Sequence, residues 1–166
     1  MTAIEQWCVA HGWPAPWVVV LVAMLPVAEL RGAIPLALWG FRLDPWASLG
    51  WALLGNLLIV PPVVFFLEPL YQWLRRFRIG RRFTEWCERH ARRRAAIVER
   101  LELVGLALFV AVPLPGTGAW TGALVASLCR FQRWRACGAI AAGVVVAGLV
   151  VLAGAVGVEQ LVHRLR

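Results

Sequence analysis

Glu29 and Arg31 are the residues whose types and spacing most directly suggest chemistry, because they place an acid and a base two positions apart within an apolar stretch. If that stretch lies in a membrane, each unpaired charge near the bilayer centre costs about 2.5–3.5 kcal/mol on insertion scales. Charges in that position normally have a partner or a water-filled cavity. We therefore expect a substrate or proton site here. The alternative is a structural ion pair that fixes the local fold.

A second group of candidate residues shares proline, glycine and hydroxyl chemistry around the middle of a later apolar segment. It consists of Pro113, Pro115, Gly116, Thr117, Gly118, Trp120 and Thr121. Prolines and glycines this close together cannot continue an uninterrupted helix, so we expect a new helix to begin near Ala119. The N–H groups at its start could bind an anion. The threonine hydroxyls could assist, or could equally bond to the local backbone.

Pro35 and Asn56 complete the set of candidate site residues. Proline suits the first turn of a helix because its missing N–H would have no partner there, so Pro35 predicts a helix that begins near Ala33. The starts of this helix and of the helix near Ala119 would, together with Arg31, form a cradle for an anion such as a phosphate head group. Asn56 lies mid-run, where its amide could bind substrate or join helices.

The elements that must position these residues are membrane helices. The chain has 166 residues, of which 61% are apolar and 16% charged, against about 45–50% and about 25% in soluble domains. Ten tryptophans suit membrane interfaces. The runs 46–67 and 136–158 carry no charge and contain 22 and 23 residues, more than the roughly 20 that cross a bilayer. We expect spanning helices over 46–71 and 136–158.

The sequence carries no motif of an enzyme class, such as G-x-S-x-G or a P-loop. Its four cysteines show no C-x-x-C spacing and have no clustered histidine partners. We therefore expect neither catalysis, nor a metal site, nor a cofactor.

Two further apolar segments, 17–41 and 103–129, are each interrupted near the middle. A half of nine or ten residues covers roughly 14–15 Å, about half of a bilayer core of about 30 Å. Each segment could therefore be one kinked spanning helix. It could also be a re-entrant hairpin that reaches the midplane and returns to the side from which it entered.

The positions of the arginines favour re-entrant hairpins. The net charge is +8 and every basic residue is arginine; ten lie between 75 and 100, and Arg130, Arg133 and Arg135 follow the second interrupted segment. Short basic loops collect in the cytoplasm, and only the re-entrant arrangement puts both clusters there. Both termini are then outside. Residues 72–100 form a cytoplasmic amphipathic helix that binds anionic lipid, and we expect no nucleic acid partner.

These features predict an all-α integral membrane protein with a single membrane domain over 1–166. A first repeat (17–71) and a second repeat (101–158) each consist of a re-entrant helical hairpin followed by a transmembrane helix. The two have opposite orientations and are joined by the arginine-rich connector. Such an inverted repeat is typical of secondary transporters, whose substrate sites lie where broken helices meet.

The residues around both interruptions resemble a known family. They read PVAELRGAIPL from Pro26 and PLPGTGAWTG from Pro113, with Gly55-Asn56 between them. In this order they resemble the small multidrug export family of prokaryotic membrane proteins, which is similar in plan to the DedA/VTT superfamily. That resemblance implies opposed re-entrant hairpins in the inner membrane and proton-linked translocation of lipids, including the polyprenyl-phosphate carrier. Here, unlike in DedA-type proteins, no arginine closely follows the aromatic Phe109.

We therefore expect a transporter, most simply a translocase of lipid or polyprenyl phosphate. Glu29 would be its proton-linked switch and Arg31 part of its head-group site. One alternative is a proton-coupled exporter of small amphipathic drugs. Another is a structural membrane protein that transports nothing. The expected partners are membrane lipids and a second copy of the chain.

Overall fold

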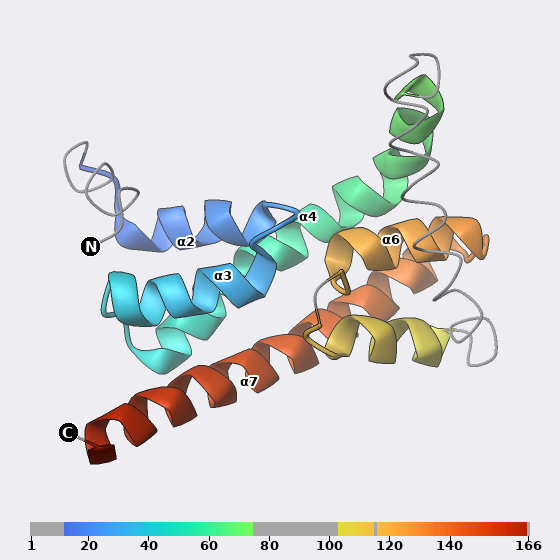
Figure 1. Cartoon of the computed structure of the whole chain (residues 1–166). Helices are drawn as coiled ribbons and strands as arrows, with labels where there is room; N and C mark the ends of the chain where they lie inside the picture. The colour runs from blue at the N-terminus through green and yellow to red at the C-terminus, as the bar shows by residue number, and fades with distance from the viewer. Residues whose placement is uncertain (1–11, 75–102, 115, 166) are drawn as a thin grey trace. The chain divides into compact units, whose positions relative to one another are not determined.

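The computed structural model describes residues 12–74, 103–114 and 116–165, and these contain helices and no strand (Figure 1). In chain order the helices are α2 (Ala15–Met24), α3 (Glu29–Pro35), the π-helix η1 (Leu36–Gly40), α4 (Pro45–Leu74), a helix over 103–111, α6 (Ala119–Leu128) and α7 (Arg133–Leu165). The all-helical prediction is confirmed. The predicted connector lies outside the described residues, except that 72–74 form the end of α4.

Both predicted spans correspond to long apolar helices, and α4 and α7 extend beyond the predicted bounds. Their candidate membrane spans are Pro45–Phe66 and Arg133–Val162, with mean hydropathies of 2.0 and 2.6. Asp44 sets the start of α4, because its Oδ2 accepts hydrogen bonds from the N–H groups of Trp46 and Ala47 at 3.0 and 3.2 Å. A capping aspartate followed by proline is a favourable helix start.

The contacts within the chain divide it into two compact units. The first contains the chain up to Leu58 and from Val145 onward, and the second runs from Ile59 to Val144. Both α4 and α7 therefore contribute one part to each unit. Each unit also contains one of the two interrupted segments.

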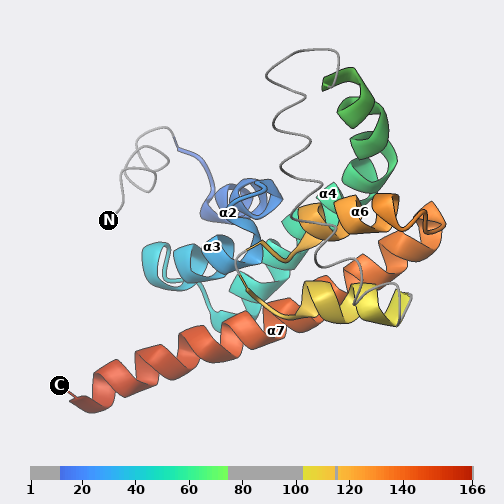
Figure 2. The same ribbon diagram turned by 45° about the vertical axis from the view of Figure 1, so that its right-hand side comes forward.

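In the first unit, α2 packs against α3 and η1 (Figures 1 and 2). The break after α2 follows from Pro26, because a proline ring disfavours helical backbone at the preceding residue. Leu25 is accordingly extended, with φ −72° and ψ 138°. The first part of α4 approaches α2 closely, since a Cβ placed on Gly55 would overlap the backbone of Val20.

The predicted helix start near Ala33 is wrong. The helix α3 begins at Glu29, and Pro35 is its last residue instead of a first-turn residue. Proline inside a helix removes one N–H donor and crowds the carbonyl four residues earlier. The chain meets this by widening into η1, where the N–H of Phe41 donates to the carbonyl of Leu36 at 3.0 Å.

In the second unit, the helix over 103–111, α6 and the beginning of α7 pack together (Figures 1 and 2). Gly122 of α6 lies against Val110 and Ile140, and Gly143 of α7 lies against the carbonyl of Ala107. The helix α6 begins at Ala119, as predicted.

The last part of α4 and the first turn of α7 meet in the same unit. The rings of Phe65 and Trp134 are in edge contact, with their centroids 4.9 Å apart. The guanidinium of Arg133 lies 5.8 Å from the centroid of the Phe65 ring. The end of the first candidate span therefore lies beside the beginning of the second.

Candidate functional site

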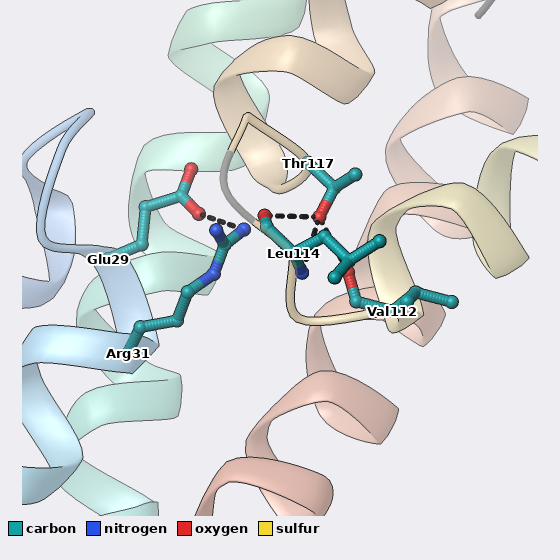
Figure 3. A network of polar contacts seen from close by, with 5 residues as sticks. All are labelled: Glu29, Arg31, Val112, Leu114 and Thr117. Atoms are coloured by element: carbon teal, nitrogen blue, oxygen red, sulfur yellow. Dashed lines mark hydrogen bonds and ion pairs between the residues drawn. The ribbon is translucent and has the colours of Figure 1, made fainter.

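The structure brings Glu29 and Arg31 together at the start of α3. Oε2 of Glu29 lies 3.6 Å from Nη2 of Arg31 (Figure 3). The carboxylate is almost completely buried, whereas 28% of the Arg31 side chain is exposed. Burial of a carboxylate without a partner is costly, so the ion pair stabilises a charge that would otherwise be unfavourable there.

The backbone of Glu29 has an unusual conformation. Its φ is +44°, in the left-handed region that L-residues other than Gly, Asn and Asp rarely adopt. Its N–H still donates to the carbonyl of Leu25 at 3.1 Å, and the N–H of Gly32 donates to the carbonyl of Ala28 at 2.8 Å. Such strain costs about 1–3 kcal/mol and is concentrated at functional sites. At Glu29 the strained backbone carries a buried ionisable side chain.

The helix start that was predicted for the anion cradle lies at Glu29 and not near Ala33. Ala33 lies inside α3, and the first turn carries the acidic Glu29. A negative side chain at a helix N-terminus already complements the helix dipole. In this unit the predicted cradle would therefore consist of the guanidinium of Arg31 and a helix start that already carries an acidic side chain.

In the second unit, the Thr117 hydroxyl bonds to the local backbone (Figure 3). Its Oγ1 lies 2.5 Å from the carbonyl oxygen of Val112 and 2.8 Å from that of Leu114, and it accepts the N–H of Leu114 at 3.1 Å. A hydroxyl has one proton and two lone pairs, so these contacts satisfy it. Of the two roles that the sequence left open for Thr117, the structure shows the local one.

The remaining residues of this segment form the turn before α6. Gly116 and Gly118 have φ values of +78° and +147°, which only glycine adopts readily. Trp120 and Thr121 lie in the first turn of α6 and are partly exposed. Pro113 lies in the break after the helix over 103–111, and Pro115 lies outside the described residues.

Asn56 is buried in the first unit with one polar atom unsatisfied. The residue is 1% exposed, and its Oδ1 has no hydrogen-bond partner among the described residues. A buried acceptor without a partner costs about 1–3 kcal/mol, so it calls for a ligand or a water molecule. The amide oxygen of Asn56 therefore joins no helices among the described residues.

Sequence reasoning missed a cavity beside the turn between α6 and α7. Arg130 and Arg133 line this cavity. From the sequence, these two arginines served only to predict the orientation of the chain in the membrane. The sequence does not show that these two side chains border the same cavity, because their positions depend on the backbone conformation at the end of α6.

Residues 29–150 match the model of a family described as "Putative small multi-drug export protein". The matched region includes the first interrupted segment from Glu29 onward and the whole of the second. It also includes all of α4 and the first half of α7. Comparison with curated proteins gave no match, and neither did comparison with solved structures.

Proposed function

Because the chain belongs to this family of small multi-drug export proteins, we propose that it is a multi-pass inner-membrane transporter that translocates a phosphate-bearing lipid. The description of the family supports transport in general. The lipid substrate, proton coupling and kinship in plan with the DedA/VTT superfamily are our proposals. The observation that carries the first two is the ion pair between the buried Glu29 and the partly exposed Arg31.

The pair can act as an exchange site. The carboxylate of Glu29 and a lipid phosphate are both anions that bind a guanidinium through charge-assisted hydrogen bonds, so they compete for Arg31. A proton on the Glu29 carboxylate removes its charge and with it most of its attraction for Arg31. When Glu29 takes up a proton, it releases Arg31 to the phosphate, and when the phosphate leaves, Glu29 loses its proton and the pair re-forms. Proton uptake is thereby linked to head-group binding.

The contact between Phe65 and Trp134 supports a re-entrant second segment. It places the end of one candidate span beside the start of the next, so residues 67–132 leave and return on one side of the membrane. Within that stretch, 75–100 is too rich in arginine to cross the membrane. The interrupted segment 103–129 would then have to enter and return on the same side.

The division into two units supports an inverted repeat. Each unit combines one interrupted segment with one part of α4 and one part of α7. Two units of the same composition, each with an interrupted segment, are what a pair of repeats would give, and discontinuous helices in both repeats are typical of inverted-repeat transporters. With the arginine-rich side in the cytoplasm, both termini are outside.

Asn56 adds a hydrogen-bond acceptor in the unit that contains Glu29 and Arg31. Its unsatisfied Oδ1 suits a hydroxyl or N–H donor of the substrate, which would remove the cost of the buried acceptor. A substrate that carries both a phosphate and a donor group would use both features.

The test is lipid flipping in liposomes that contain the purified protein and a fluorescent lipid phosphate. We expect Arg31→Ala to lower the flipping rate about tenfold or more, because a charge-assisted bond contributes about 1.5–3 kcal/mol. Arg42→Ala is the matched control, since Arg42 is an exposed arginine of the same unit. Equal rates for the wild type and Arg31→Ala would remove the proposed site.

The family description also favours a second candidate, an exporter of small amphipathic drugs. The first unit offers aromatic surface for it, because Trp17 and Trp51 have ring centroids 5.9 Å apart and Trp39 is half exposed. This candidate predicts that expression of the protein raises drug tolerance and dye efflux. Unchanged drug tolerance and dye efflux would contradict this second candidate and favour the lipid substrate.

A further inference from the structure

The second unit contains a partly open cavity of about 350 Å³ beside the turn that joins α6 to α7. Its lining includes Ser127, Arg130, Phe131 and Arg133, together with small and aliphatic side chains of α4, α6 and α7. None of the described lining residues is acidic. Two guanidinium groups and a hydroxyl therefore border a space whose charge suits an anion.

Arg130 occupies a position where glycine is the usual residue. It follows α6 with φ +55°, its N–H donates to the carbonyl of Ser127 at 3.1 Å, and the N–H of Phe131 donates to the carbonyl of Ala126 at 3.0 Å. This is the Schellman pattern of a helix C-terminus, in which the left-handed residue is commonly glycine. An arginine in this left-handed conformation is strained, whereas a glycine would not be. The stability of the turn therefore does not explain why this position is an arginine.

Arg133 is oriented by an aromatic neighbour. Its guanidinium lies 5.8 Å from the centroid of the Phe65 ring, within the range of a cation–π contact. A guanidinium held in this way loses less side-chain freedom when it binds an anion. Arg130 and Arg133 thus border the cavity from the two ends of a short turn.

The cavity lies at the level where lipid head groups are expected. The second candidate span begins at Arg133, and the first ends at Phe66. Phe66 and Trp134 are 68% and 71% exposed, as is typical of aromatic residues at the membrane interface. The anionic group that a bilayer chiefly presents at this level is the phosphate of a lipid head group.

We propose that this cavity binds the phosphate head group of an anionic phospholipid, through the guanidinium groups of Arg130 and Arg133 and the hydroxyl of Ser127. The site is separate in its residues from Glu29 and Arg31. It does not depend on the protein being a lipid translocase, because a drug exporter or a structural protein would bind lipid here in the same way.

The test uses the full chain in detergent with a photoactivatable phosphatidylglycerol, and the labelled peptides are mapped. We expect Arg130→Gly to reduce labelling of the peptides around residues 123–136 about tenfold, as the loss of a charge-assisted contact predicts. The thermal midpoint should stay the same or rise, because glycine suits the left-handed backbone. Arg133→Gln should reduce the same labelling.

Arg42→Gly is the matched control. Arg42 is also an exposed arginine with a left-handed backbone, φ +53°, and it belongs to the other unit. We expect its labelling to equal that of the wild type. Unlabelled phosphatidylglycerol should compete, whereas phosphatidylcholine and inorganic phosphate at the same concentration should not. Undiminished labelling in Arg130→Gly would overturn the site, and equal competition by inorganic phosphate would overturn its assignment to a lipid.

Discussion

The ring of Phe65 meets the ring of Trp134 edge-on, with 4.9 Å between their centroids. Phe65 lies next to the end of the first candidate span and Trp134 next to the start of the second. One aromatic contact thus links the two membrane helices at a single end and limits the paths that the chain between them can take.

This relationship predicts that positions 42 and 132 face opposite sides of the membrane. Both Arg42 and Gln132 are exposed and precede α4 and α7, respectively. In a variant without the four native cysteines, we expect Arg42→Cys to react with an impermeant thiol reagent from outside. Gln132→Cys should react only after the membrane is opened. Labelling of both from outside would mean that the interrupted segment 103–129 spans the membrane.

Gly55 should be sensitive to the smallest enlargement. A Cβ at this position would overlap the backbone of Val20, which cannot move as a side chain could. We expect Gly55→Ala to lower the free energy of unfolding by about 1–3 kcal/mol, the usual cost of overpacking. Gly50→Ala in the same helix is the control, because no atom lies within 4 Å of a Cβ there. Thermal unfolding in detergent measures both, and equal midpoints would contradict the close packing of α2 and α4.

Asn56 should contribute to function at the expense of stability. Replacing it with leucine removes the unsatisfied Oδ1, so we expect Asn56→Leu to leave the free energy of unfolding unchanged or to raise it by about 1 kcal/mol. Transport should fall at the same time. Ser48→Ala, at a buried serine whose Oγ lies 3.5 Å from the carbonyl of Leu43, is expected to lower stability instead. Loss of stability in Asn56→Leu would indicate a structural amide.

The spanning helices and both breaks could be predicted from the sequence because their causes are local. A charge-free run of sufficient length predicts a span wherever it occurs. Pro26 and the glycines 116 and 118 interrupt helices through their own backbone restrictions or freedoms. The start of α6 at Ala119 was predicted for the same reason.

The start of α3 could not be read from Pro35, because residues earlier in the chain set where the helix begins. The break at Leu25 and Pro26 is followed by a left-handed Glu29, after which the helix forms at once. Proline at the seventh position is tolerated through the widening into η1. The basic cavity was missed because Arg130 occupies a position where the sequence signal for a helix end would be glycine.

In the proposed mechanism, Glu29 links proton uptake to lipid transport through Arg31. The most direct measurement compares lipid flipping by wild type and Glu29→Gln, in liposomes with and without an imposed pH gradient. We expect the gradient to change the wild-type rate several-fold and to leave the rate of Glu29→Gln unchanged, because glutamine keeps the shape of the side chain but carries no exchangeable charge. A variant that flips lipid and responds to the gradient as the wild type does would contradict the claim.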